Sequence, residues 1–406
     1  MKKRTALLLT LLLIMVVVLS AVGLTACKPK DEKTGFHVSV FYYDYKDTYI
    51  STVRNEIDAR LKGLGVNYQS YDGKNDQATQ IADIDTALSQ GTNLLIVNIV
   101  KTDSVDSARN IVNKAQAKNV PVVFFNREPP PAIFTTDWAI TNTAFVGTNF
   151  VQAGYMQGQM IAEYLLKPEN LTQDGKSKFD VDSNNEVKYI MLRGEMSNNE
   201  AIARTLYSVL TANIMLKQAD ASFTLKPSDG NVESGDVDPP LGWEYNYGGV
   251  KKDLATVMSE NTFKPLKFYL VDPEGSWSSA AATNLLDTAF AKPGMLSGGC
   301  ELIIANNDGM ALGAISSLQK KNYNKGGTSP IIPVFGVDAT SEARQAINDG
   351  KLMGSISQSN VSMAQMIVQV MTNAAAKKPL ADFGTLNVEI DGLGKNMIRI
   401  PYGIVT

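Results

Sequence analysis

Apolar residues recur along this chain in two spacings, which predict alternating strands and helices. Continuous apolar runs at 94–97 and 121–125 are rich in β-branched and aromatic residues, which is typical of parallel strands buried on both faces. Strands are predicted at 37–43, 93–100, 120–126, 144–147, 187–192, 267–271, 302–305 and 331–337. Elsewhere apolar residues return after three or four positions, as at Ile50, Val53 and Ile57, which predicts a helix with one apolar face.

This alternation of strand and helix continues from residue 36 to about residue 375. Further helices are predicted around 81–88, 156–165, 278–291 and 361–376. The order calls for βαβ units, and therefore for parallel sheets with helices on both faces. Two Rossmann-like lobes of the α/β class are more economical than one very large sheet. The polar stretches 166–185 and 219–264 interrupt the rhythm and are interpreted as surface excursions.

The first 27 residues read as an export signal. Three positive residues, Lys2, Lys3 and Arg4, precede an apolar run, and Leu24-Thr-Ala-Cys27 follows it. This order is typical of a bacterial lipoprotein, so we expect residues 1–26 to be removed and Cys27 to carry the lipid. Residues 27–35 would then be a flexible tether that holds the protein on the outer face of the cell membrane. An uncleaved membrane anchor is the alternative.

Composition narrows the functional classes. The net charge is −3, with 19% charged and 44% hydrophobic residues, as in ordinary globular proteins, and it lacks the basic excess that nucleic acid requires. The single histidine, His37, argues against chemistry that depends on a histidine base. Two cysteines exclude a disulfide scaffold and a structural zinc cluster, and Cys300 is expected to be a buried free thiol.

Polar and aromatic residues gather where the predicted strands end, which is where ligands bind in α/β sheets. The candidate binding residues are Asp47, Tyr49, Asn98, Asn198, Glu200, Arg204, Trp277, Asn307, Asp338 and Gln358. Carboxylates, amides and a guanidinium match the hydroxyls of a pyranose, and the two aromatic side chains match its apolar faces. Each residue also has a structural alternative: Asn307 and Asp338 as helix caps, Arg204 in a surface ion pair, Trp277 in packing.

Several segments together resemble the bacterial glucose/galactose-binding proteins, which are type 1 periplasmic binding proteins. The matching segments are 47–54, 74–77, 119–129, 145–148, 304–308, 333–338 and 399–402. The resemblance covers nearly all of 36–402 apart from the excursions. It implies two lobes joined by a three-strand hinge, with crossings near residues 120, 357 and 398. The lobes would then comprise 36–120 plus 358–398, and 121–357 plus 399–406.

The resemblance also implies a site for one hexose between the lobes. Asp47, Asn98, Arg204, Asn307 and Asp338 would hydrogen-bond the sugar, and Tyr49 and Trp277 would sandwich its ring. Tyr49 stands where the family usually has Phe, and three further positions depart from the family pattern, with Asn198 for His, Glu200 for Asp and Gln358 for Asn. Sugar binding is therefore better supported than the identity of the sugar, and a pentose, a methyl-glycoside or an amino sugar remains open.

A calcium loop is a second feature that the resemblance implies. Asp180, Asp182, Asn184 and the Glu186 carbonyl occupy its ligand positions, and Glu301 matches a distant acid. Asn185 replaces the turn glycine, and Lys188 stands at a ligand position although an ammonium can only donate. Its charge could substitute for the metal. A structural Ca²⁺ and a metal-free acidic surface loop both remain open, and no other cofactor is expected.

The predicted function is that of a monomeric, lipid-anchored receptor that closes on a monosaccharide and delivers it to an ABC-type permease in the membrane. A sugar sensor that presents its ligand to a chemoreceptor or kinase ectodomain is the alternative. No nucleic-acid partner is expected. An extracellular glycosidase using Glu200 and Asp338 is disfavoured, because no nucleophile–base pair is evident and a retaining site needs two carboxyls about 5 Å apart.

Overall fold

A computed structural model describes residues 35–228, 242–261, 269–272, 274–383, 389–390 and 396–406. Cys27, the export signal and all of the tether except Gly35 lie outside the described residues. Cys300 is a buried free thiol, as expected, and burial raises its pKa to about 12. None of the helices in the described part of the chain combines the length and the apolar character that crossing a membrane requires.

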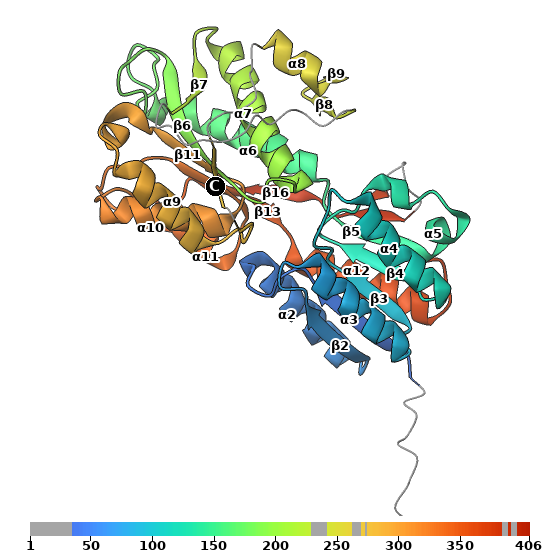
Figure 1. Ribbon diagram of the computed structural model, residues 1–406. Helices are drawn as coiled ribbons and strands as arrows, with labels where there is room; N and C mark the ends of the chain where they lie inside the picture. Colours follow the sequence, from blue (N-terminus) through green and yellow to red (C-terminus); the bar gives the residue numbers. More distant parts are fainter. Residues whose placement is uncertain (1–34, 229–241, 262–268, 273, 384–388, 391–395) are drawn as a thin grey trace, which may run out of the picture. The chain divides into compact units, whose positions relative to one another are not determined.

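Within the described residues the first sheet has seven strands in the order β14-β15-β5-β4-β3-β1-β2. Figure 1 labels β5, β4, β3 and β2 of this sheet. In chain order these are β1 (His37–Tyr42), β2 (Asn67–Asp72), β3 (Leu94–Val97), β4 (Val122–Phe125), β5 (Thr143–Gly147), β14 (Glu389–Ile390) and β15 (Met397–Arg399). All neighbours are parallel except β14 and β15. Because β3 and β4 are apolar throughout and fully buried, helices must cover both faces of this sheet.

Five helices among the described residues belong to this first lobe. They are α2 (Thr48–Gly63), α3 (Gln77–Ser89), α4 (Val105–Ala117), α5 (Asp137–Asn142) and α12 (Asn360–Ala375), with a short 3₁₀ turn at Pro131–Ile133. The helix α12 packs against α2 and against β3, β4 and β5, so a late segment of the chain returns to the first sheet. The predicted apolar face of α2 is confirmed, because Ile50, Val53 and Ile57 are all buried.

The second sheet has the order β10-β6-β11-β12-β13-β16, and β7 also pairs with β6. Its strands are β6 (Glu186–Arg193), β7 (Thr224–Pro227), β10 (Tyr269–Val271), β11 (Leu302–Ala305), β12 (Val334–Asp338), β13 (Gly354–Gln358) and β16 (Tyr402–Val405). Only the β13–β16 pair is antiparallel. The helices that belong to this second lobe are α6 (Phe150–Leu165), α7 (Asn199–Ala219), α9 (Ser279–Phe290), α10 (Asp308–Lys320) and α11 (Ser341–Asn348). Short turns at Pro168–Asn170 and Met295–Gly299 complete it.

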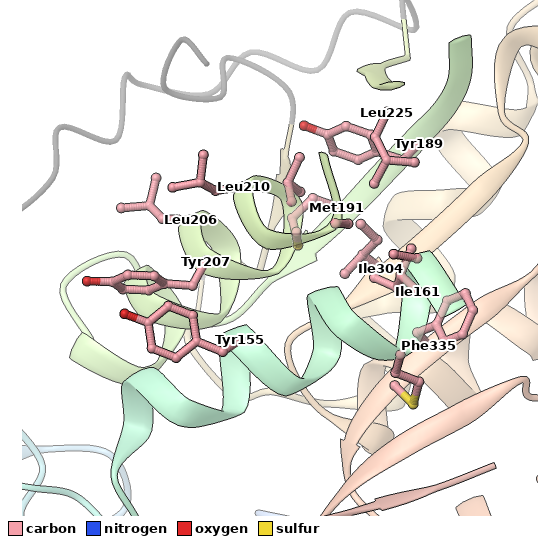
Figure 2. Close-up of a cluster of buried hydrophobic side chains, with 14 of the residues drawn as sticks. Tyr155, Ile161, Tyr189, Met191, Leu206, Tyr207, Leu210, Leu225, Ile304 and Phe335 are labelled. Carbon is pink, nitrogen blue, oxygen red and sulfur yellow. The ribbon is translucent and has the colours of Figure 1, made fainter. Parts of the chain in front are cut away.

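Two apolar cores cover the two faces of the second sheet. One contains side chains from α6 and α7, and the other contains side chains from α9 and α10. Figure 2 shows the first core, with Tyr155 and Tyr207 next to each other and their ring centroids 4.7 Å apart. The predicted fold class, two parallel-sheet α/β lobes flanked by helices, is confirmed.

The expected change of lobe near residue 120 is wrong. The strands β4 and β5 continue the first sheet, so that lobe extends to Gly147 and the chain crosses to the second sheet after it. The two later crossings lie between β13 and α12, and between β15 and β16. An apolar run identifies a buried strand but not the sheet that the strand joins, because both sheets bury their strands equally.

The prediction that 219–264 is a surface excursion is also wrong for the described part of this stretch. It contains β7, a hairpin of β8 (Glu244–Tyr247) and β9 (Val250–Asp253), and the helix α8 (Leu254–Glu260). Tyr245 is 1% exposed and Leu254 is fully buried. Tyr247 stacks on Tyr155, with ring centroids 5.2 Å apart. This segment therefore extends the core of the second lobe over α6 and α7.

Candidate functional site

A cavity of about 320 Å³ lies at the carboxyl ends of strands from both sheets. It is lined by Tyr43, Asp47, Tyr49, Ile50, Asn126, Arg127, Asn198, Glu200, Arg204, Trp277, Asn307, Asp338 and Gln358. All of the candidate binding residues predicted from the sequence are in this set except Asn98. The strand-end argument therefore located the cavity, although the two lobes were divided at the wrong residue.

Asn98 does not line the cavity. It is fully buried, and its Oδ1 accepts from the backbone N of Tyr43 at 3.3 Å. Its Nδ2 donates to the carbonyl of Phe125 at 3.0 Å and to Oδ1 of Asn126 at 3.1 Å. Its predicted role as a direct ligand contact is corrected to a supporting one, because these bonds occupy its amide and hold the loops after β1 and β4 together.

Three of the cavity residues, Asp47, Asn198 and Asn307, cap helices, which is the structural alternative given for Asn307. Asp47 accepts from the backbone N of Ile50 at 2.8 Å, and its second oxygen accepts from the Tyr43 hydroxyl at 2.6 Å. Asn198 caps α7 through its Oδ1, which leaves its buried Nδ2 without a partner among the described residues. Asn307 caps α10 and donates to the Trp277 carbonyl at 3.1 Å. Asp338, also expected to be a cap, is not one, since Thr340 caps α11.

The charged groups of the cavity are concentrated around Arg204, which is buried rather than part of a surface ion pair. Its Nη1 donates to the carbonyl of Asn306 at 2.9 Å, and its Nη2 lies 3.4 Å from Oε2 of Glu200. Its buried Nε has no partner among the described residues. Burial raises the pKa of the Glu200 carboxyl and raises the pKa of the Asp338 carboxyl still further. These groups are dehydrated before any ligand arrives, which strengthens their interactions with one.

Backbone strain marks the same place. Asn126, Trp277 and Asp338 have φ values of 57°, 55° and 115°, a region in which residues other than glycine are uncommon. Such conformations cost about 1–3 kcal/mol each, persist only where the surrounding structure fixes the backbone, and cluster at functional sites. Three strained residues that line one cavity are an independent sign, beyond residue type, that the cavity is a binding site.

The two predicted aromatic residues both line the cavity. The Trp277 ring sits against Gly194, where any side chain would overlap it, and the Arg204 guanidinium lies 5.8 Å from the ring centroid. Tyr49 comes from α2 in the first lobe and is 5% exposed. The cavity thus has an apolar ring from each lobe.

The sequence interpretation missed Tyr43, Ile50, Asn126 and Arg127 as residues that line the cavity. Arg127 lies over the Tyr43 ring, with its guanidinium carbon 4.0 Å from the centroid, and its Nη2 is 2.7 Å from Oε2 of Glu195. Lys101 reaches the other oxygen of Glu195 at 3.1 Å. Glu195 follows β6, whereas both cations follow strands of the first sheet, so one carboxylate holds the two lobes together at the cavity. The strand-end rule applied to 120–126 would have indicated Asn126 and Arg127.

The predicted calcium loop is present as a turn, but Lys188 occupies it. The Lys188 Nζ lies 2.8 Å from Oδ2 of Asp182 and 3.1 Å from the carbonyl of Gly298. Asp180 accepts from backbone N–H groups of the turn, and Glu301 accepts from those of Val181 and Lys188 at 2.8 and 2.7 Å. Within the described residues no cluster of three or more acidic, His or Cys side chains is arranged to hold a metal. These residues do not fit a calcium ion, because an ammonium takes the position of the cation.

We expect the thermal midpoint of the wild-type protein to be the same with calcium and with a chelator. Lys188→Gln removes the ammonium that pairs with Asp182, so the Tm of this variant should be lower than that of the wild type in chelator. Calcium should raise its Tm again, because the ion can bind the oxygens that Lys188 had occupied. Differential scanning calorimetry measures both. The matched control is Lys226→Gln, which removes an exposed ion pair with Glu186 beside the loop and should not create a calcium response. A wild-type Tm that rises with calcium would contradict the assignment.

Comparison with known proteins places the chain among binding proteins. A family model described as a periplasmic binding protein domain matches residues 38–379. A galactose/methyl-galactoside-binding periplasmic protein of Haemophilus influenzae is 27% identical over 369 residues, which span 90% of this chain and 88% of the relative. A solute-binding protein of Bacillus halodurans, solved with bound myo-inositol, superimposes with a TM-score of 0.59 at 21% identity and covers 92% of this chain and 96% of its own. One of Actinobacillus succinogenes with bound D-allose gives 0.60 at 12% identity, over 91% and 96%.

Proposed function

The chain belongs to the periplasmic binding protein domain family, and from this premise we propose that it binds a monosaccharide of the hexose type and delivers it to an ABC-type importer. The observation that carries the proposal is the composition of the cavity. Asn198, Arg204 and Gln358 line it, and each has a buried donor without a partner among the described residues; the carboxyl groups of Glu200 and Asp338 line it as well. Membership of a family of binding proteins also decides against the glycosidase.

The ligand class follows from matching these groups. Donors and acceptors in one small cavity suit hydroxyls, because each hydroxyl both donates and accepts. Tyr49 and Trp277 provide apolar rings against which the C–H faces of a sugar can pack. The relatives with named ligands take galactosides, myo-inositol and D-allose, all of them polyols. Glu200, Gln358 and Asn198, which depart from the family pattern, would select among such polyols.

Closure of the lobes would follow from the position of the site. The first lobe contributes Asp47 and Tyr49, and the second contributes Trp277 and Asp338, so a sugar satisfies all of them only when the lobes are closed. The ion pairs of Glu195 with Arg127 and Lys101 add contacts between the lobes that need no ligand. The closed form would then present one defined surface to the permease.

The family places the protein outside the cytoplasm. We propose further that it is a monomer and that a lipid on Cys27 anchors it to the outer face of the cell membrane. A sugar sensor that reports to a chemoreceptor or kinase ectodomain uses the same cavity and is the alternative. Loss of sugar uptake on deletion of the gene supports transport, whereas normal uptake with loss of a sugar response supports sensing.

The purified protein should show thermal stabilisation by one or two members of a sugar panel. The panel contains D-glucose, D-galactose, a methyl galactoside, D-allose, D-ribose, myo-inositol and D-glucosamine. A ligand at a hundred times its Kd adds about 2.7 kcal/mol to the free energy of unfolding, which gives a readable shift in Tm. Trp277→Ala is the control and should lose the shift. No shift and no calorimetric heat with any of these sugars would reject the proposed function.

A further inference from the structure

Three side chains meet where the chain passes between its two sheets. Thr148 follows β5 at the first crossing, Gln358 ends β13 at the second, and Tyr402 begins β16 at the third. The Thr148 hydroxyl lies 2.7 Å from the Tyr402 hydroxyl and 3.1 Å from Oε1 of Gln358, and the Tyr402 hydroxyl lies 3.1 Å from the same Oε1. We call these three residues the crossing cluster. All three are at least nine-tenths buried.

The direction of each hydrogen bond in this cluster follows from counting its donors and acceptors. Arg204 can only donate, and it lies against the Tyr402 hydroxyl. Burial raises the pKa of Tyr402 to about 12, and the positive charge of Arg204 and the hydrogen bond from Thr148 oppose that rise. The Tyr402 oxygen accepts from the Thr148 hydroxyl at 2.7 Å, and its own proton is left for the Gln358 oxygen at 3.1 Å. The amide of Gln358 must then turn its Oε1 toward Tyr402, whose hydroxyl Thr148 holds in place.

In the same arrangement the Nε2 amide group of Gln358 makes no hydrogen bond within the described residues. Gln358 lines the cavity and is 3% exposed, yet its buried Nε2 has no hydrogen-bond partner among the described residues. The Tyr49 hydroxyl is close enough to Gln358 for its pKa to be affected, but no hydrogen bond of acceptable geometry forms from Nε2. A buried donor without a partner costs about 1–3 kcal/mol, and in a residue that lines a cavity a ligand can supply the missing acceptor.

We propose that Thr148 and Tyr402 are positioning residues of the binding site, which lock the Gln358 amide so that it presents two N–H donors to the ligand. This inference rests on the proposed function and adds a specificity rule to it. The ligand must place an acceptor oxygen beside Gln358, and a ligand that carries an ammonium there is rejected. Neither Thr148 nor Tyr402 lines the cavity, so each acts through Gln358.

A double-mutant cycle tests the proposal. Tyr402→Phe and Thr148→Val remove the two hydroxyls while keeping the shapes of the side chains. Together they should raise the Kd of the best sugar of the panel about 10- to 100-fold by calorimetry, which is the worth of one or two buried hydrogen bonds. In a Gln358→Ala background the same two changes should add less than about twofold, because there is no amide left to orient. A purely structural role would give the same loss in both backgrounds.

Tyr189→Phe is the matched control. Tyr189 is fully buried in the second sheet, and its hydroxyl has no partner among the described residues. Its removal should leave Kd unchanged. Unchanged affinity in Tyr402→Phe/Thr148→Val, or an undiminished loss in the Gln358→Ala background, would overturn the proposal.

A ligand-free measurement separates this inference from the proposed function. In the wild-type protein the two side-chain amide protons of Gln358 should give one sharp pair of NMR signals that exchange slowly with water. In Tyr402→Phe/Thr148→Val the pair should shift and broaden as the amide begins to rotate. Signals that are the same in both proteins overturn the inference even if sugars bind. A wild-type protein that binds no sugar but shows the change rejects only the proposed function.

Discussion

Replacing Asp338 by glycine should raise the Kd for sugar at least about 100-fold, because charge-assisted hydrogen bonds contribute about 1.5–3 kcal/mol each and a sugar can offer two hydroxyls to one carboxylate. Among the cavity carboxylates, Asp338 has the fewest hydrogen-bond and ion-pair partners within the described residues. Asp47 caps α2 and holds Tyr43, and Glu200 faces Arg204, whereas the Asp338 side chain makes no hydrogen bond to another described residue that would compete with a ligand.

The same variant should be more stable than the wild type without ligand. The φ of residue 338 is 115°, which suits glycine, so the strain of about 1–3 kcal/mol disappears. Glycine loses more chain entropy on folding, and this loss offsets roughly 0.5–1 kcal/mol of the gain in stability. The substitution also removes the buried carboxyl group of Asp338, which affects how stability depends on pH. Because burial raises the folded-state pKa of Asp338 above its unfolded value, the folded state holds the proton more tightly. The wild-type protein therefore loses stability as pH rises from the unfolded pKa through the folded one, and the variant should lose less.

Isothermal calorimetry and urea unfolding at several pH values measure the two effects. Asp338→Asn is the matched control, because it removes the charge but keeps the side chain and the backbone strain. It should lose affinity without the gain in stability that relief of strain provides. Wild-type affinity in Asp338→Gly would contradict the assignment of this carboxylate to the ligand.

Gly194→Ala should weaken sugar binding about 10-fold although it removes no polar group and no aromatic ring. A Cβ at residue 194 would lie 2.5 Å from Cζ2 of Trp277, so the ring must move. A gap of 0.5–1 Å between ring and sugar forfeits about a quarter to a half of their dispersion attraction. The shift also disturbs the Trp277 carbonyl, to which Asn307 donates.

Tryptophan fluorescence and calorimetry test this second prediction together. The emission spectrum of Gly194→Ala should differ from that of the wild type before any ligand is added, and the Kd should rise. Gly63→Ala is the matched control, because Gly63 ends α2 with open space around it, and an added methyl group meets nothing within 4 Å. An unchanged Kd with a shifted spectrum would show that the ring does not contact the ligand.

Periodicity predicted the parts of the fold that depend on local burial. The strand at 302–305 has the predicted limits, and the helix around Ile50 extends only slightly beyond its apolar positions. The strand-end rule predicted most of the cavity for the same reason, since it depends on neither sheet order nor lobe boundary. By contrast β2, whose residues are mostly polar and half-exposed, has no apolar run to reveal it.

The parts that sequence alone did not predict depend on contacts between distant residues. Asn98 ends a strand like the other candidates, but residues 43, 125 and 126 use its amide. Tyr402 and Thr148 carry no local signal at all, since their role comes from the meeting of three crossings. Lys188 is the exception. Its charge alone argued against a calcium ligand, and the structure places its ammonium in the loop.

The three crossings have a further consequence for the order in which the protein can be completed during synthesis. The strand β15 joins β5 in the first sheet, β16 joins β13 in the second, and α12 covers α2. The first lobe therefore lacks a strand until residue 399 has been made, and the second lacks one until residue 405. A nascent chain that ends before β15 is incomplete in both lobes, so a premature stop at that point would damage both lobes together.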